Sequence, residues 1–180
     1  MITVVTGNKG KAAEVAAFFA GITDVTHTPF EAVEPQAESV AEIARAKAEQ
    51  AYAALSTPLI VDDTGLFVEA LGGFPGPYAA YVQDTVGNDG ILRIMAGIEN
   101  RRAYFATAVA YADADGIRVF EGKVDGEITL SPRGTDGFGY DPIFAVGEKT
   151  LAEMTITEKN QVSHRARALE EFRKWYVSLR

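Results

Sequence analysis

The fold is decided first by residues 2–11, which read ITVVTGNKGK. Residues 2–6 are β-branched or apolar, a pattern typical of a buried strand. A turn that contains glycine follows, and a helix is expected from about Lys9 to Phe19, ending at Gly21. A strand that leads through a tight turn into a helix is the usual building block of α/β folds. The stretch therefore predicts an α/β protein.

Strands and helices continue to alternate beyond this stretch. The clearest helix pattern covers residues 38–54, where Ser39 can cap the first turn and Glu42 stands three residues further on. Further strands are expected at 25–28, 59–62, 103–111 and 117–123, and further helices at 88–96 and 164–178, the last capped by Ser163. Interleaved strands and helices, with one hairpin, predict a mixed central sheet with flanking helices.

The composition is that of a globular protein. Of the 180 residues, 47% are hydrophobic and 23% are charged, which excludes wholesale disorder. No cysteine is present, so thiol nucleophiles, disulfides and cysteine metal sites are excluded. The net charge of −8 disfavours nucleic acid as a partner. No apolar run suits a membrane span and no basic flank precedes the first strand, so we expect a cytoplasmic protein.

Residues 6–11 form the first candidate site, because they lie between a predicted strand and a predicted helix. Backbone N–H groups of a glycine-rich turn and of a helix N-terminus attract an anion, and Lys9 and Lys11 add positive charge. A plain strand-to-helix turn with solvated lysines is the alternative. The spacing is not that of a P-loop, since Ala12 stands where Ser or Thr is needed.

Acidic residues form a second group of candidates. Asp62 and Asp63 come at the end of a predicted strand, where carboxylates suit Mg²⁺ binding or proton abstraction. Neighbours in an extended chain point to opposite sides, so the two need not share a role, and a solvated turn is the alternative. The stretch with Glu31, Glu34, Glu38 and Glu42 is best explained as a solvated face. Lys47 lies roughly 140° around the helix from Glu42, so these two would not serve one small site.

Two segments in the second half combine aromatic and basic residues. Residues 138–142, FGYDP, place two rings in a loop, where they can stack on a base or anchor the loop in the core. Residues 159–165, KNQVSHR, gather a lysine, a histidine and an arginine at a predicted helix start, where cations oppose the helix dipole. That placement favours an anionic or carbonyl-bearing ligand, and pairing with acids such as Glu158 is the alternative.

Together these segments resemble the inosine triphosphate pyrophosphatase family. The resemblance runs in the family's order through five segments: residues 6–8 with Lys11 and Glu14, 62–66 running into 70–78, 138–144, 152–154, and 159–160 before 163–165. Five matching segments in one order make chance a poor explanation. Ile43, Ala79 and Tyr81 depart from the residues common in the family, which affects the expected packing rather than the chemistry.

The resemblance also implies roles for individual residues. Asp63 is similar to the family's proton acceptor that activates water, and Glu34 and Asp63 to its Mg²⁺-linked carboxylates, with Glu38 as the rival of Glu34. Triphosphate binding is implied for Thr6, Gly7, Asn8, Lys9, Gly10, Lys11 and Lys47. Further substrate contacts are implied for Thr64, Phe138, Gly139, Tyr140, Asp141, Lys159, His164 and Arg165. Phe138 would stack on the base, and His164 and Arg165 would lie near the purine 6-oxo group.

The function that the resemblance implies is hydrolysis of non-standard purine nucleoside triphosphates, such as ITP, dITP and XTP, to the monophosphate and pyrophosphate. We expect a Mg²⁺-dependent homodimer that removes these nucleotides from the nucleotide pool. Residues 1–180 would form one elongated, two-lobed domain with the active-site cleft between the lobes. A nucleotide sensor without catalysis and a phosphatase that releases orthophosphate are the rivals. The presence of Lys11, Asp63 and Lys159 argues against the sensor.

Overall fold

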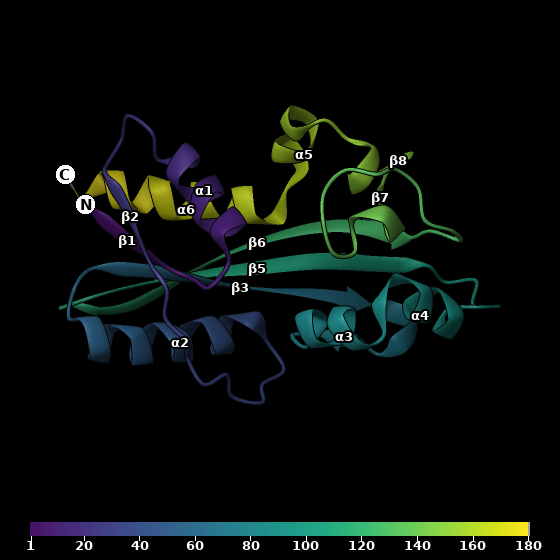
Figure 1. The fold of residues 1–180 in the computed structure, drawn as a ribbon, viewed down its shortest axis with the longest axis horizontal. Coiled ribbons are helices and arrows are strands. Elements are labelled where there is room, and N and C mark those ends of the chain that lie inside the picture. The colour runs from purple at the N-terminus through teal and green to yellow at the C-terminus, as the bar shows by residue number, and fades with distance from the viewer. Residues whose placement is uncertain (180) are drawn as a thin grey trace. The chain divides into compact units, whose positions relative to one another are not determined.

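The predicted strands and helices occur in the predicted order, together with further short elements (Figure 1). The computed structural model describes residues 1–179, apart from the side chains of Lys9, Gly10, Ile156 and Asn160. Over these residues, eight strands form one sheet in the order β2-β1-β3-β5-β6-β7-β8, with β4 paired to β3. The strands are β1 Ile2–Val5, β2 Val25–Thr28, β3 Leu59–Val68, β4 Pro75–Gly76, β5 Arg102–Asp113, β6 Gly116–Ile128, β7 Phe144–Val146 and β8 Lys149–Thr150.

Parallel and antiparallel neighbours both occur, so the predicted mixed sheet is confirmed. Strand β1 runs parallel to β2 and β3, whereas β4 is antiparallel to β3, and β7 is antiparallel to β6 and β8. The helices are α1 Lys9–Phe18, α2 Val40–Leu55, α3 Ala79–Thr85, α4 Gly87–Ile94, α5 Ile156–Val162 and α6 His164–Ser178. As predicted, the Ser39 hydroxyl caps α2 by accepting a hydrogen bond from the Glu42 N–H.

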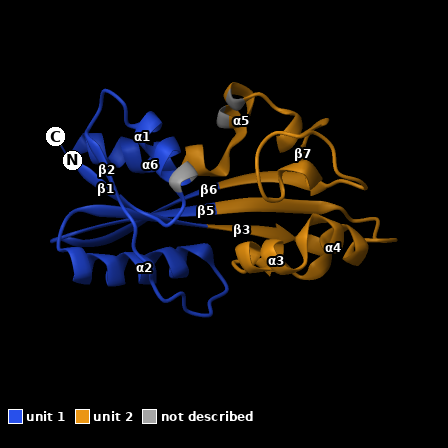
Figure 2. Ribbon diagram, in the orientation of Figure 1, with its two compact units in different colours: residues 1–63, 107–122, 168–180 blue, residues 64–106, 123–167 orange. Residues whose placement is uncertain are grey.

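The chain divides into two compact units (Figure 2). Unit 1 consists of residues 1–63, 107–122 and 168–180, and unit 2 consists of residues 64–106 and 123–167. Each unit has its own hydrophobic core, so each is described by itself. A single domain over residues 1–180 and a cleft between two lobes stay predictions.

Unit 1 is a layered α/β structure. Helices α1 and α6 lie on one face of its strands and α2 lies on the other (Figure 1). The first face is filled by aromatic side chains, since the Phe172 ring lies 5.5 Å from that of Phe19 and 5.4 Å from that of Tyr111. The second face is shallower, because α2 presents mainly small residues, Ala44, Ala48 and Ala51 among them.

Unit 2 has a core made of aliphatic and aromatic side chains from strands, short helices and loops. Leu66 of β3, Ile91 of α4 and Phe144 of β7 are fully buried in it. The rings of Phe105 and Phe144 meet edge to face at 4.6 Å. This core supports the loop that carries Tyr140, which is buried among the same residues.

Several elements differ from the prediction. Strand β3 continues through Asp62 and Asp63 to Val68, so the aspartate pair lies inside the strand rather than at its end. The extension is stabilised by β4, which pairs with Leu66 and Phe67. The short elements β4, α3, β7, β8 and α5 were not predicted. No helix in the described part of the chain is long and apolar enough to cross a membrane.

We predict that Phe172→Ala lowers the free energy of unfolding by about 3–5 kcal/mol, because it opens a cavity between α1 and α6. Val177→Ala is the matched control in the same helix, since Val177 is 51% exposed, and it should change stability by less than about 0.5 kcal/mol. Urea denaturation followed by circular dichroism measures both. Equal losses in the two variants would contradict the assignment of Phe172 to the core.

Candidate functional site

The turn after β1 is held by its own side chains. The Thr6 hydroxyl accepts a hydrogen bond from the Asn8 N–H at 3.1 Å, and Asn8 Oδ1 accepts one from the Lys11 N–H at 3.2 Å. Asn8 therefore acts as the cap of α1. His27 of β2 adds a contact of 2.8 Å between its Nε2 and the Thr6 carbonyl, which the sequence did not predict. The side chains of Lys9 and Gly10, also predicted to bind triphosphate, lie outside the described residues.

The two adjacent aspartates face different helices, because successive side chains of a strand alternate. Asp62 forms an ion pair of 2.9 Å with Lys11 of α1. Asp63 forms one of 3.1 Å with Lys47 of α2. The expectation that neighbouring carboxylates need not share a role therefore agrees with their contacts. The alternative of a solvated Asp-Asp turn is wrong, since Asp63 is only 8% exposed.

Lys47 joins two carboxylates. Its ammonium lies 2.8 Å from Glu34 Oε1 and 3.1 Å from Asp63 Oδ1. Of the two glutamates that compete in the sequence, Glu34 is thus the one in recorded contact with Lys47. The second oxygen of Asp63, Oδ2, is buried and has no hydrogen-bond partner among the described residues. An acceptor left in this state is unusual and points to a ligand or water.

Burial sets the electrostatics of this cluster. Removal from water raises the pKa of Asp63 to about 6, although the Lys47 charge lowers it, and the Glu34 charge adds to the increase. Burial alone would lower the pKa of Lys47, but the Asp63 and Glu34 charges and hydrogen bonds outweigh it, so that pKa lies above its ordinary value. Asp63 is consequently ionised at neutral pH, and it becomes protonated when the pH falls through about 6.

Two observations test whether this cluster suits a divalent cation. The Lys47 ammonium already stands as a cation between the Glu34 and Asp63 oxygens, and the buried Asp63 Oδ2 still lacks a partner among the described residues. No group of three or more His, Cys, Asp or Glu side chains gathers in the described part of the chain. Mg²⁺ needs only one or two carboxylates when substrate phosphates and water complete its shell. Glu34 and Asp63 are therefore compatible with Mg²⁺ where other ligands complete its shell.

In unit 2, Asp141 organises the aromatic loop. Its Oδ2 accepts a hydrogen bond of 2.9 Å from the Phe138 N–H and one of 2.6 Å from the Lys159 ammonium. The same ammonium lies 4.9 Å from the centroid of the Phe138 ring. Gly137 permits this arrangement, because its φ is +79° and a Cβ there would collide with the Asp141 carboxylate. Phe138 itself is 56% exposed, so one face of its ring is available to a ligand.

The two aromatic residues of the loop have different environments. The buried Tyr140 donates a hydrogen bond of 2.7 Å from its hydroxyl to the Ala79 carbonyl. Gly139 accepts one of 3.0 Å from the Asn88 side-chain amide. Tyr140 therefore anchors the loop in the core, as one sequence alternative held, whereas Phe138 can stack on a base. No local pattern in the sequence indicates Asn88, because its contact with Gly139 spans 51 residues.

The basic segment that follows belongs to two helices. Lys159 lies in α5 and His164 begins α6, which corrects the expectation that they share one helix start. His164 and Arg165 are buried, the His164 ring stacks on Phe105 at 4.9 Å, and Arg165 Nη2 lies 3.5 Å from the Thr64 hydroxyl. Glu158, the acid expected nearby, pairs with Lys149 instead. Unit 2 thus brings together Thr64 with Arg165, and Phe138 with Asp141 and Lys159.

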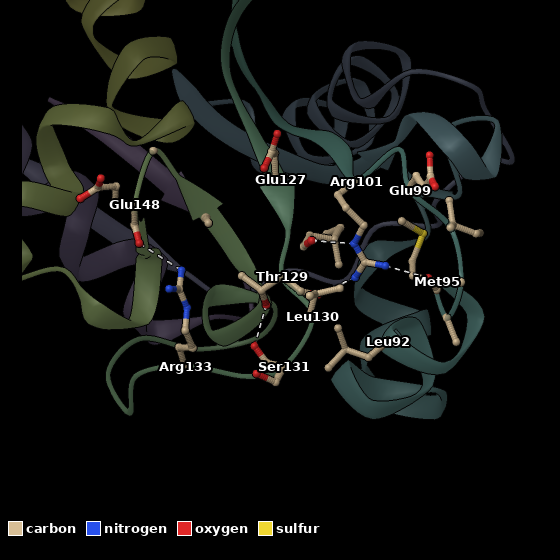
Figure 3. Close-up of a pocket in the computed structure, with 16 residues that line it drawn as sticks. Leu92, Met95, Glu99, Arg101, Glu127, Thr129, Leu130, Ser131, Arg133 and Glu148 are labelled. Atoms are coloured by element: carbon tan, nitrogen blue, oxygen red, sulfur yellow. Dashed lines mark hydrogen bonds between the residues drawn. The ribbon is translucent and has the colours of Figure 1, made fainter.

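A pocket of about 1030 Å³ in unit 2 contains none of the predicted site residues (Figure 3). The Arg101 guanidinium on its wall bonds the carbonyls of Met95, Ile128 and Thr129. Such bonds use the guanidinium to hold the backbone rather than to bind an anion. The predicted residues that the structure does describe lie elsewhere in the two units.

Comparison with known proteins shows which family the chain belongs to. A model of the Ham1 family matches residues 2–175. The chain belongs to the Ham1 family. The dITP/XTP pyrophosphatase of Methanopyrus kandleri is 48% identical over 176 residues, which is 95% of this chain and 93% of that protein. The dITP/XTP pyrophosphatase of Thermococcus kodakarensis is 44% identical, over 97% of this chain and 96% of that protein.

Solved structures of the Ham1 family agree with the fold. The Staphylococcus aureus Ham1 protein has a TM-score of 0.89 and 31% identity, with 100% of both chains covered. The resemblance stated from five sequence segments is confirmed by these full-length matches. The roles of individual residues rest on the contacts above and stay predictions.

We predict that Asp63 in the Ham1 chain titrates near pH 6 rather than near the value of about 4 of an exposed aspartate, because burial disfavours its charge. Carboxyl ¹³C NMR of the metal-free, chelator-treated protein measures this. Lys47→Gln should raise the midpoint, since the lysine charge lowers the Asp63 pKa, and Lys11→Gln should raise it less. A midpoint near 4, or a larger effect of Lys11→Gln, would contradict this account.

Proposed function

We propose that the chain is a nucleoside triphosphate pyrophosphatase that converts dITP, XTP and ITP to the monophosphate and pyrophosphate. The observation that carries the proposal is the identity of 44–48% over nearly the whole chain with relatives named dITP/XTP pyrophosphatase. The ionisable groups agree with it, because hydrolysis of a triphosphate needs a base for water and cations for phosphate oxygens. Both kinds of group meet in the Lys47–Asp63–Glu34 cluster.

Asp63 is the proposed base. Its carboxylate takes the proton from the attacking water, and its pKa of about 6 leaves it ionised at neutral pH without making it a weak base. Lys11 and Lys47 would neutralise the phosphate oxygens, with the Thr6–Asn8 turn and the N-terminus of α1 beside them. Glu34 and Asp63 would hold Mg²⁺, which supplies positive charge to the leaving pyrophosphate. The proposal also includes the homodimer, which analytical ultracentrifugation can measure.

Unit 2 is proposed to select the base. Phe138 offers a ring face for stacking, and its backbone and Lys159 are fixed by Asp141. Donors from His164 and Arg165 match the 6-oxo group of hypoxanthine or xanthine. The 6-amino group of adenine would meet them as another donor and leave buried donors unpaired, which discriminates by orders of magnitude. Tyr140 and Gly139 serve this site as anchors of the loop.

The test of the proposal is product analysis with purified protein, Mg²⁺ and dITP, XTP, ITP or ATP. We expect monophosphate plus pyrophosphate from the first three and little turnover of ATP. Asp63→Asn should keep nucleotide binding and lower turnover at least about a hundredfold, because the base is removed. Orthophosphate as the product would support the phosphatase alternative, and binding without turnover would support a sensor.

Substitution at the aromatic loop tests base stacking. Phe138→Ala should raise KM for ITP at least about fivefold with a smaller change in kcat, since stacking contributes about 1–3 kcal/mol per base. Phe138→Trp keeps a stacking face and should restore most of the affinity. Leu130→Ala removes another exposed apolar side chain of unit 2, 86% exposed, and should leave KM unchanged. An unchanged KM for Phe138→Ala would remove the stacking role.

A further inference from the structure

The Lys47 side chain occupies the position of a cation. Three oxygens surround its ammonium: Glu34 Oε1 at 2.8 Å, Asp63 Oδ1 at 3.1 Å and the Asp62 carbonyl at 3.5 Å. Two of them belong to the carboxylates that suit Mg²⁺. Glu34 is 55% exposed at its side chain, whereas Lys47 and Asp63 are largely buried, so the ammonium sits at the inner end of the cluster.

A resident ammonium and a divalent cation oppose each other at this position. Like charges separated by a few ångströms repel strongly in a partly buried environment. With Lys47 present, its charge compensates one of the two negative charges of Glu34 and Asp63, which weakens the attraction for a metal ion. With Lys47 withdrawn, the same two carboxylates form an uncompensated anionic pair that attracts a dication.

We propose that Lys47 is a resident counter-ion that closes the cation site until substrate phosphates arrive. The ammonium then leaves Glu34 and Asp63 for phosphate oxygens, and the freed carboxylates can hold a divalent cation. The inference rests on the proposed function for its ligand, and adds to it a coupling between phosphate and metal binding that one side chain carries. Such coupling is reciprocal, because each ligand changes the affinity for the other by the same factor.

The side chain is suited to this exchange. A lysine ammonium is a compact charge on a flexible four-carbon stem, so it can change partners while its backbone stays in a helix. Lys47 lies within α2, which is capped at both ends by serine residues and is therefore a fixed base for the movement. A metal ion that bound before phosphate would displace the Lys47 ammonium and leave it without a new anionic partner. Metal binding to the nucleotide-free protein should therefore be weak.

Lys11 provides the matched comparison. It forms an ion pair of similar length, 2.9 Å, with the adjacent Asp62 on the other side of β3. Its removal changes the net charge of the protein as much as removal of Lys47, but it leaves the contacts of Glu34 and Asp63 in place. A difference between the two variants therefore measures the local position of the charge rather than the total charge.

The experiment is titration of nucleotide-free protein with Mn²⁺, followed by electron paramagnetic resonance of the free ion. Lys47→Gln should bind Mn²⁺ at least about tenfold more tightly than the unchanged protein, because one opposing charge is gone. Lys47→Arg keeps the charge and should bind as weakly as the unchanged protein. Lys11→Gln should tighten binding less than about threefold. Circular dichroism establishes that each variant is folded, and if Lys47→Gln does not fold, Lys47→Met takes its place.

Addition of pyrophosphate measures the coupling. In the unchanged protein, pyrophosphate should tighten Mn²⁺ binding by a larger factor than in Lys47→Gln. Direct contact between metal and phosphate contributes to both factors, so the ratio of the two factors reports the contribution of Lys47. Equal or weaker Mn²⁺ binding in Lys47→Gln, or the same factor in both proteins, would overturn the inference. The proposed function is tested separately by product analysis of the unchanged protein. If dITP gives no pyrophosphate while Lys47→Gln still binds Mn²⁺ more tightly, the function fails and the counter-ion role stands.

Discussion

The burial of one carboxylate beside one ammonium is the constraint on which the chemistry of unit 1 depends. Asp63 is buried inside a strand of the sheet, and its Oδ1 pairs with the Lys47 ammonium at 3.1 Å. The ion pair is therefore held by the fold rather than by its own strength, because removing either partner leaves the other charge buried. Burial raises the pKa of Asp63 to about 6 although the Lys47 charge lowers it, and it leaves Asp63 Oδ2 without a hydrogen-bond partner among the described residues.

Unit 2 also holds a buried aspartate beside a lysine, Asp141 beside Lys159, but this aspartate has a different role. Asp141 is also buried, but its contacts go to the backbone of Phe138 and to Lys159, so it fixes the shape of a loop. Two aspartates thus have separate tasks because their neighbours differ. Hydrogen bonds of Tyr140 to Ala79 and of Asn88 to Gly139 also fix the loop, and Phe138 is its exposed ring.

The sequence predicts most of the longer helices and strands, because the signals for them are local. Ser39 before an alanine-rich helix and the glycine turn after the first strand each specify a boundary. Local signals do not predict structure that depends on pairing with a distant segment. Residues 62–65, Asp-Asp-Thr-Gly, have poor strand propensity, yet they lie in β3, which pairs with β4 just beyond them. Helix α5 could have been found from its capping box, Thr155 with Glu158. The Lys47 contacts could not, since Glu34 and Asp63 meet it only through tertiary packing of segments 13 and 16 residues away.

The core of unit 1 has a further consequence for how the chain is made. Phe19, directly after α1, packs on Phe172 of α6. During synthesis, the N-terminal strands and α1 therefore leave the ribosome long before their main partner exists. Unit 2, by contrast, lies between these ends and has all its residues available earlier. The apolar face of unit 1 therefore stays uncovered until Phe172 has been synthesised, and during that interval it is open to non-native contacts.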